Sequence, residues 1–349
     1  MINKDKNWVL PLAFVVALGA GPALGQQIES SRGSAGEEAS RMAPGGAELD
    51  RDATPIAPPK LNDDEASRSA PAGDPDEILR NMGTVTRSKD GSESRQPASD
   101  EMRRALSGAF VDPAFQGEES DRQVIGPDDR VRVTNTTQFP FRAIGLLQSE
   151  SQSGNFGTCS ATLIGPRTIL TAAHCLYNHD DGGWNKDFLF APGLNSMQDA
   201  PFGVYSWENA HILEGYITNY QGHYGSVVPW DLGIVILDQP IGDHLGWLGF
   251  GHDPQLGNFV ANIVGYPGDK EGGTMWRANC DIVPENVAEV IFIYDCDTYP
   301  GSSGSAVYRF DAQSEERTIF GVNVAETQEF NIAVRLNAPY FQWVAGLRQ

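Results

Sequence analysis

Runs of apolar and β-branched residues predict short β-strands in the last two thirds of the chain. After about Val124, such runs are separated by Gly, Pro and Asn, which are typical of turns. Their spacing favours antiparallel barrels or a sandwich. The runs that fit strands are Arg142 to Leu147, Ser160 to Ile164, Leu232 to Leu237, Phe259 to Tyr266, Val290 to Tyr294, Ser305 to Phe310, Thr318 to Val324 and Asn331 to Leu336.

Helical spacing is clearest at the C-terminus. Between Ala338 and Arg348, the side chains of Phe341, Val344 and Leu347 fall on one face of a helix. We therefore expect an all-β fold with a terminal helix docked on it.

The N-terminus has the pattern of an export signal. Lys4 and Lys6 precede an apolar stretch from Trp8 to Ala20, and Ala23-Leu24-Gly25 offers a cleavage site with small residues. The alternative is a membrane anchor, but Pro and Gly leave the stretch shorter than a membrane span requires. We predict a signal peptide over residues 1–25 and a secreted, extracellular protein, with the periplasm as the alternative location.

Residues 26–123 have a composition that predicts little burial. Ser, Ala, Gly, Pro, Asp and Glu dominate, and no aromatic residue occurs before Phe110. We expect a low-complexity and largely disordered segment, with short helices at Ile78 to Met82 and Met102 to Leu106. It is either a linker or a propeptide, and its position directly after a signal favours the propeptide.

Charge excludes one class of partner. The 349 residues include 25 Lys and Arg against 46 Asp and Glu, a formal net charge of −21. The basic residues are scattered, which argues against binding to nucleic acid or anionic lipid. The acidic stretch Asn178 to Asp181 lacks the ligand spacing of a calcium loop, so we interpret it as a surface turn. We expect no metal, no organic cofactor, no stable membrane association and a monomer.

Four cysteines in an exported chain favour disulfides over metal ligation. Pairing Cys159 with Cys175 and Cys280 with Cys296 closes two loops of similar length without crossing. Four cysteines allow three pairings, and the other two stay open at this point.

Three short motifs carry candidate chemistry. His174 ends an apolar run, Asp231 precedes an apolar strand, and Ser303 lies in a turn rich in Gly and Ser. Each has a structural explanation when taken alone: a histidine that bridges backbone groups, an acid at a strand start and a solvated loop. Their combination favours a catalytic interpretation.

A serine hydroxyl attacks a carbonyl only when a base accepts its proton and donors stabilise the new oxyanion. His174 would be that base, and Asp231 would hold the imidazole in the right tautomer. Gly301 can adopt backbone angles closed to other residues, which allows the N–H groups of Gly301 and Ser303 to converge on the oxyanion.

The order His, Asp, Ser and the flanking residues resemble the chymotrypsin-like serine proteases, and bacterial glutamyl endopeptidases in particular. Residues 124–130 with 134–137 are similar to the mature start of those enzymes, and residues 265–270 to an internal segment. The resemblance implies a protease domain over residues 124–349, with the active site between two six-stranded antiparallel β-barrels. It implies His174 as general base, Asp231 as orienting acid, Ser303 as nucleophile, and an oxyanion hole formed by Gly301 and Ser303. It also implies the Cys159–Cys175 pairing.

Activation departs from the trypsin-like pattern. Ser302 stands where those enzymes have an Asp that pairs with the new N-terminal ammonium. The resemblance implies a precursor cut just before Val124. In the glutamyl enzymes the new amine helps to receive the substrate's carboxylate, so Val124 is a candidate substrate-binding residue.

The specificity pocket is ambiguous. Asn323 replaces the His that glutamyl enzymes carry after the nucleophile, which weakens a preference for Glu. Asp297 stands where trypsin-like enzymes hold the acid that selects Lys and Arg. The alternative is that its carboxylate is tied into local hydrogen bonds and does not bind substrate. Thr298 could donate to a substrate carboxylate, and Glu326 could line the pocket mouth.

The sequence therefore predicts a secreted serine endopeptidase that acts on proteins or peptides through an acyl-enzyme on Ser303. A preference for Glu and one for Lys or Arg through Asp297 both remain open. The rival class is a non-catalytic secreted binding protein on the same scaffold, and an esterase is a third candidate.

Overall fold

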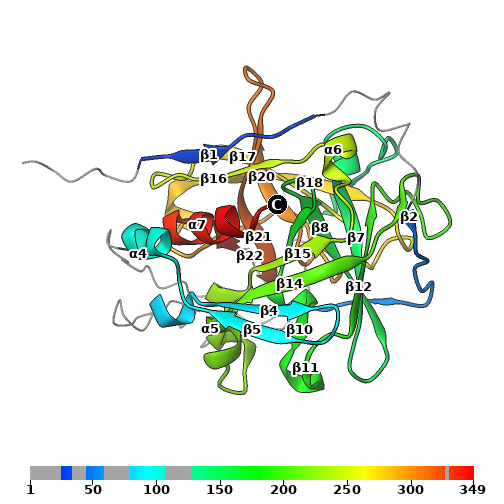
Figure 1. Ribbon diagram of the computed structural model, residues 1–349. Helices are drawn as coiled ribbons and strands as arrows, with labels where there is room; N and C mark the ends of the chain where they lie inside the picture. Colours follow the sequence, from blue (N-terminus) through cyan, green and yellow to red (C-terminus); the bar gives the residue numbers. More distant parts are fainter. Residues whose placement is uncertain (1–24, 34–44, 59–78, 107–126, 327–329) are drawn as a thin grey trace, which may run out of the picture.

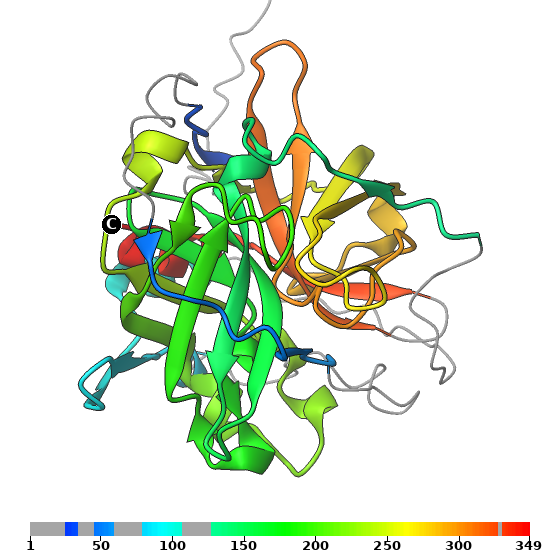
Figure 2. The ribbon, with the colours of Figure 1, turned by 90° about the vertical axis from the view of Figure 1, so that its right-hand side faces the viewer.

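The computed structural model describes residues 25–33, 45–58, 79–106, 127–326 and 330–349. Two β-sheets stand side by side, and a C-terminal helix packs near their junction (Figure 1, Figure 2). The predicted all-β fold class with a terminal helix is confirmed: the structure is mostly β-strand and ends in a helix. The signal prediction for residues 1–25 falls almost entirely outside the described residues.

The first sheet has nine strands in the order β12-β7-β8-β9-β15-β14-β4-β5, with β3 paired to β8. Six of these strands come from the part of the chain after residue 127, the number that the family resemblance implies for one barrel. Their bounds are β3 Thr54–Pro55, β4 Thr84–Ser88, β5 Glu93–Gln96, β7 Ile144–Glu150, β8 Phe156–Leu163, β9 Thr168–Thr171, β12 Asp187–Pro192, β14 Trp207–Leu213 and β15 Gly233–Leu237.

The second sheet also has nine strands, in the order β1-β16-β21-β20-β17-β18-β6, with β22 pairing to both β21 and β19. Its pairings are antiparallel except between β16 and β21. The bounds are β1 Gln27–Glu29, β6 Val131–Arg132, β16 Gly249–His252, β17 Phe259–Gly265, β18 Trp276–Ile282, β19 Ile291–Tyr294, β20 Ala306–Phe310, β21 Arg317–Glu326 and β22 Asn331–Arg335.

Short elements connect the strands. Two further strand pairs are β10 with β11 and β2 with β13. The bounds are β2 Gly45–Gly46, β10 Tyr177–Asn178, β11 Gly183–Trp184, β13 Gly203–Val204, α4 Asp100–Leu106, α5 Glu214–Thr218, α6 Gly242–Leu245, α7 Ala338–Leu347, η1 Phe141–Ala143, η2 Ala173–Cys175, η3 His179–Asp181, η4 Tyr224–Ser226, η5 Val228–Trp230 and η6 Pro284–Asn286.

The terminal helix α7 begins with a side-chain cap. Asn337 Oδ1 accepts a hydrogen bond from the backbone N–H of Tyr340 at 3.1 Å, and Pro339 lies in the first turn. The helix buries Trp343 and Val344 in a core that both sheets share. The same core reaches the first sheet through Ile169 and Val235, so one apolar interior fixes the two sheets relative to each other.

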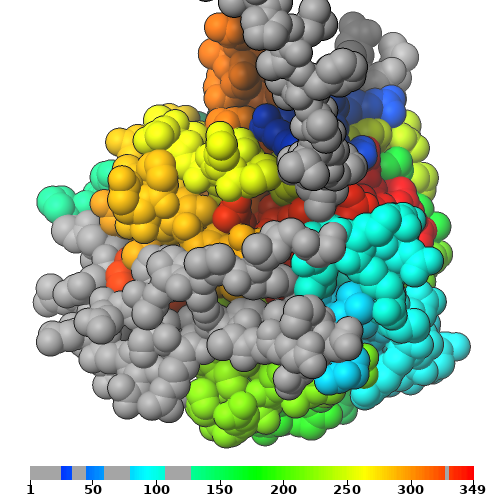
Figure 3. Space-filling model, turned by 90° about the vertical axis from the view of Figure 1, so that its left-hand side faces the viewer, coloured from blue at the N-terminus to red at the C-terminus, as the bar shows by residue number. Residues whose placement is uncertain are grey.

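The prediction that residues 26–123 are largely disordered is wrong for the described parts of this segment. Strand β4 extends the first sheet along β14, with Val85 fully buried, and α4 packs on α7. Trp343 also donates a hydrogen bond to Thr84 Oγ1 at 2.9 Å. In Figure 3 the cyan residues around 84–106 lie beside the red C-terminal helix.

The physical reason is that β4 is paired on both sides, by β14 and by β5, so it needs few apolar side chains. The main-chain N–H and C=O groups of β4 pair with those of its neighbours. This pairing compensates for the polar composition of the strand. Of the two short helices predicted there, α4 is confirmed, and residues 79–81 are helical within the first. Within the described residues, no helix combines the length and apolar character that crossing a bilayer requires.

Candidate active site

His174 and Asp231 form a buried pair. His174 lies in the 3₁₀ turn η2 directly after β9, and Asp231 follows η5 and leads into β15. Because β9 pairs with β15, these two chain segments are brought together. The His174 backbone N–H donates to Asp231 Oδ1 at 2.9 Å, and Nδ1 donates to Oδ2 at 2.7 Å. Asp231 is fully buried, and His174 is 6% exposed.

This pairing fixes the imidazole chemically. A carboxylate only accepts hydrogen bonds, so the ring proton sits on Nδ1 and the lone pair on Nε2. Nε2 is buried and has no hydrogen-bond partner within the part of the chain that the structure describes. The arrangement leaves a base at Nε2, with a negative charge behind it to stabilise the protonated ring.

Ser303 lies in the turn before β20, and the turn packs against the strands that lead to His174. Its backbone carbonyl accepts from Ser160 N at 2.8 Å, on β8. Gly304 has a φ of +83°, and a Cβ there would lie 2.2 Å from Thr171 Oγ1 on β9. Glycine is therefore needed for the turn to approach β9 this closely. The Ser303 Oγ is buried and has no hydrogen-bond partner among the described residues.

Gly301 has the backbone angle that the sequence predicts. Its φ is +97°, and a Cβ there would lie 2.5 Å from the carbonyl oxygen of Tyr266. Ser160 Oγ donates to the Gly301 carbonyl at 2.9 Å and so holds the turn from the opposite side. The Gly301 N–H donates to the carbonyl of Ile56 at 3.2 Å, a contact that the sequence did not predict.

Tyr224 is a second residue that the sequence analysis missed. Its hydroxyl lies 3.2 Å from His174 Nδ1 and 3.5 Å from the carbonyl oxygen of Val324, to which it donates. The two rings meet edge to face, with centroids 6.0 Å apart. Tyr224 stands seven residues before Asp231 in the chain, and its side chain bridges the imidazole and β21. An isolated Tyr in a loop gave no sequence signal.

The pocket candidates cluster around the Ser303 turn. Asp297 is buried and accepts from the Asp129 backbone N–H at 3.0 Å. Thr298 is buried, and its Oγ1 has no hydrogen-bond partner in the described ranges of the chain. Glu326 is 7% exposed, at the end of β21. This neighbourhood therefore combines acidic groups with a hydroxyl donor on Thr298 that is unused among the described residues.

Asn323 is bonded within the protein at both ends of its amide. Its Oδ1 accepts a hydrogen bond from the Tyr294 hydroxyl, and its Nδ2 donates to the Ser302 carbonyl at 3.2 Å. Burial, with the nearby charge of Glu326, raises the pKa of Tyr294 well above its usual range, so this phenol keeps its proton. Asn323 thus ties β21 to the residue before the nucleophile candidate.

The expected mature start at Val124 lies outside the described residues, but the chain around Asp128 and Arg130 is held by ion pairs. Arg130 is buried and makes ion pairs with Asp128 and Asp269. The hydrogen bonds from Arg130 hold the pKa of Asp128 well below its usual range, so Asp128 stays ionised. This network fixes the chain on either side of the Asp129 N–H that contacts Asp297.

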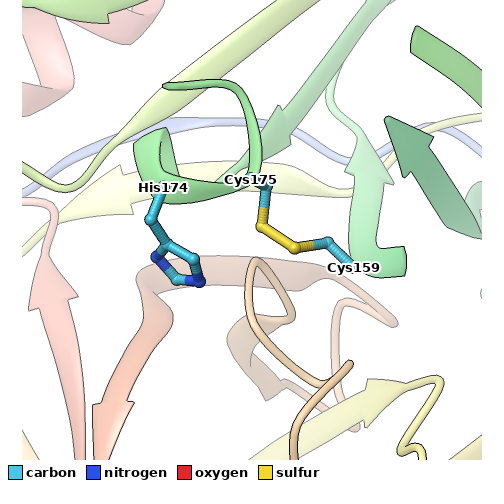
Figure 4. Close-up of side chains that lie close together, drawn as sticks. All are labelled: Cys159, His174 and Cys175. Carbon is cyan, nitrogen blue, oxygen red and sulfur yellow. A yellow bond between two sulfur atoms is a disulfide. The ribbon is translucent and has the colours of Figure 1, made fainter. Parts of the chain in front are cut away.

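Both predicted disulfides are confirmed. Cys159 is bonded to Cys175 and Cys280 to Cys296, each pair 16 residues apart. The first disulfide lies beside His174, on the same helical turn (Figure 4). It ties the residue next to the base to strand β8.

The donor set beside His174 does not fit a metal ion. Within the described residues, the one group of His, Cys and acidic side chains with donor atoms close together is Cys159, His174 and Cys175. Its two sulfur atoms are bonded to each other, whereas metals bind cysteine as free thiolate.

Two hollows flank His174. The larger has a volume of about 580 Å³ and an aromatic lining that includes Tyr216, Tyr220 and Tyr224. In it, His179 stacks on Tyr220 with ring centroids 3.8 Å apart, and burial lowers the pKa of His179, so this ring is neutral at pH 7. The smaller has a volume of about 260 Å³ and is lined mainly by Ser, Asn and Thr.

Comparison with known proteins gives a consistent family assignment. Residues 130–344 match the family described as Trypsin. A glutamyl endopeptidase of Bacillus licheniformis is 36% identical over 203 residues, which are 57% of this chain and 58% of that relative's length. An extracellular metalloprotease of Bacillus subtilis is 31% identical over 223 residues, 62% of this chain and 67% of the relative.

A solved structure supports the same assignment at the level of the fold. The structure described as Glu endopeptidase in complex with MPD is 26% identical and superposes with a TM-score of 0.56. The match covers 64% of this chain and 98% of that one. About a third of this chain therefore lies outside the match with that neighbour.

Proposed function

The chain belongs to the trypsin family of serine proteases, and from that membership we propose that it is an exported endopeptidase with Ser303 as nucleophile, His174 as general base and Asp231 as the acid that orients it. The observation that carries the proposal is the buried His174–Asp231 pair, which leaves Nε2 without a partner. Ser303 Oγ is also buried and has no partner among the described residues, so it makes no hydrogen bond with His174 Nε2 in this structure. The proposal requires that bond to form when substrate binds.

The proposed reaction has two steps. As the Ser303 oxygen attacks the peptide carbonyl carbon, its proton passes to His174 Nε2. The carbonyl oxygen becomes an oxyanion that accepts from the N–H groups of Gly301 and Ser303. His174 then gives the proton to the leaving amine as the C–N bond breaks.

The second step releases the acyl-enzyme. Water attacks the ester carbon while Nε2 takes up one of its protons, and that proton returns to Ser303 Oγ as the carboxylic acid leaves. Asp231 stays ionised throughout and stabilises the imidazolium in both steps.

Tyr224 supports the base in this proposal. Asp231 alone leaves the ring free to tilt about the Nδ1 hydrogen bond. The Tyr224 hydroxyl beside Nδ1, itself bonded to the Val324 carbonyl, limits that tilt. We assign Tyr224 as a positioning residue.

Export and processing complete the proposal. We propose a signal peptide over residues 1–25 and a cut just before Val124 that yields the mature start. Two formed disulfides fit an oxidising compartment, and the Bacillus subtilis relative is named extracellular. N-terminal sequencing of the active form is expected to start at or within a few residues of Val124; full activity from the intact precursor contradicts the processing step.

We propose a preference for Glu before the cleaved bond, with Lys or Arg through Asp297 as the alternative. The names of the related glutamyl endopeptidases and the unused Thr298 hydroxyl support Glu. Asp297 already accepts from Asp129 N–H, which lowers its capacity to bind a substrate cation. The acidic Glu326 nearby and the engaged amide of Asn323 favour the alternative.

Cleavage of a diverse peptide mixture, read by mass spectrometry, tests both the proposed activity and the proposed residue preference. Cuts after Glu support the proposal, and cuts after Lys or Arg assign the pocket to Asp297. The absence of cuts favours a binding protein on the same scaffold. Ser303→Ala is expected to lose about 10⁴-fold or more in kcat, because the three residues act as a unit. Ser302→Ala, which removes the neighbouring hydroxyl, is the matched control and should keep most activity.

A further inference from the structure

An N-terminal segment lies across the first sheet and ends at the candidate active site. Residues 45–58, here called the strap, cross in front of the green strands in Figure 2. The strap begins in β2, which pairs with β13. At its middle, Asp50 and Gln148 on β7 exchange two hydrogen bonds: Asp50 N to Gln148 Oε1 at 2.8 Å, and Gln148 Nε2 to the Asp50 carbonyl at 2.9 Å.

The far end of the strap binds through its main chain. Strand β3 pairs in parallel with β8, next to Cys159. The Ile56 N–H donates to the Thr158 carbonyl at 2.9 Å, and the Ile56 carbonyl accepts from the Gly301 N–H at 3.2 Å. Gly301 N–H is one of the two groups that we assign to the oxyanion, so the strap uses a donor that a substrate carbonyl needs.

Glycines on the protease domain make room for the strap. A Cβ on Gly157 would lie 2.5 Å from Ile56 Cγ1, and a Cβ on Gly268 would lie 2.0 Å from Pro55 Cγ. Pro55 also lies against Gly301: its Cβ is 3.3 Å from the position that a Cβ on Gly301 would take. The fit is therefore close on both sides of the turn that carries the oxyanion donor.

The strap also lines the space beside the base. Ile56 and His174 both line the two hollows described above, and Pro58 extends along the larger one. A peptide that placed its carbonyl on Gly301 N–H would meet the Ile56 main chain there.

We propose that the strap is an intramolecular inhibitor of the protease site, held in place as an added strand on β8 and as an acceptor on Gly301. This inference rests on the proposed function and adds its regulation. Tethered on the same chain, the strap competes with substrate at an effective concentration of about a millimolar or more. A cut just before Val124 removes that tether, so processing weakens inhibition without any change in the catalytic residues.

The test uses the full chain and the rate at which a small fluorophosphonate labels Ser303. The reagent needs the serine oxygen and the oxyanion donors, so the strap should slow it. Ile56→Pro removes the N–H that bonds to Thr158 and is expected to raise the labelling rate about tenfold, the effect of losing one main-chain hydrogen bond. Gly157→Ala, which places a methyl group against Ile56 from the enzyme side, is expected to raise it similarly.

Two control substitutions lie away from the strap. Ile28→Pro puts a proline in β1, and Gly346→Ala adds a methyl group where no atom lies within 4 Å. Both are expected to label at the wild-type rate. Ser303→Ala must abolish labelling in every background.

The outcomes separate the two proposals. Equal labelling rates at Ser303 in wild type, Ile56→Pro and Gly157→Ala overturn the strap inhibitor and leave the proposed function standing. No labelling of Ser303 in any of these proteins overturns the proposed function, and the inhibitor with it. A cut after Ile56 in the wild type that Ser303→Ala lacks makes the strap a substrate, which overturns its inhibitory role.

Discussion

Replacing Asp231 with Asn tests the His174–Asp231 pair at a single atom. The side chain is fully buried and accepts two hydrogen bonds from His174, one from the backbone N–H and one from Nδ1. Asn has nearly the same shape, but only its oxygen accepts. If the Asn oxygen keeps the hydrogen bond from the His174 backbone N–H, the Asn NH₂ group faces Nδ1. Nδ1 must then become the acceptor. The ring proton moves to Nε2, and the base is lost.

The expected loss follows from that tautomer change. With Nε2 protonated, Ser303 has no acceptor for its proton, and kcat is expected to fall about 10⁴-fold, or about 5.5 kcal/mol in activation free energy. KM should change little, because the pocket is untouched. The assay is steady-state hydrolysis of a chromogenic peptide amide by the processed protein, with a denaturant unfolding curve to show that the variant folds.

Asp281→Asn is the matched control, since Asp281 is exposed on β18, and it should retain wild-type kcat. A loss of less than about tenfold in a folded Asp231→Asn protein would refute the assignment of Nε2 as the base. Asp231 would then be a structural acid at a strand start.

Three further predictions concern Tyr224, His211 and the disulfide between Cys280 and Cys296. Tyr224→Phe keeps the ring but removes the hydroxyl beside His174 Nδ1. We expect kcat to fall about threefold to tenfold at constant KM, and the acidic limb of the kcat–pH profile to shift. An unchanged profile would mean that Tyr224 has only a structural role. Burial lowers the pKa of His211 from 6.5 to about 4. Between these pH values the unfolded chain binds a proton at His211 and the folded chain does not, so stability is lost as pH falls from about 6.5 to 4. The loss is about 3 kcal/mol, measured by urea unfolding, and His211→Gln should remove it; an identical acid slope in both proteins contradicts this. Replacing Cys280 and Cys296 together with Ser opens a loop of 16 residues and should cost about 3 kcal/mol of unfolding free energy, and an unchanged midpoint argues against that loop-entropy effect.

The sequence was sufficient for the residues whose chemistry is distinctive. His174 and Asp231 stand in different motifs, and their order along the chain together with the flanking residues suggested that they meet. The structure joins them at 2.7 Å. The equal spacing of the cysteines favoured the neighbour pairings, and both are formed. Gly301 was selected for a positive φ, which it has.

The sequence was insufficient where stability comes from main-chain pairing. Strand β4 has a polar sequence, yet it pairs with β14 over five residues. The strap is held by backbone pairing in β2 and β3 and by a few apolar side chains, Leu49 and Ile56 among them. These contacts leave no periodic side-chain pattern. Tyr224 depends on a loop conformation that brings a remote hydroxyl to His174, and composition carries no trace of it.

Trapping the acyl-enzyme tests the central claim most directly. The processed protein is mixed with a slowly released peptide ester, quenched in acid, and digested for mass spectrometric mapping. The account predicts one acyl group per molecule, bound to Ser303, with none trapped in His174→Ala over the same time. An acyl group on another residue, or equal acylation of Ser303 without His174, would contradict it.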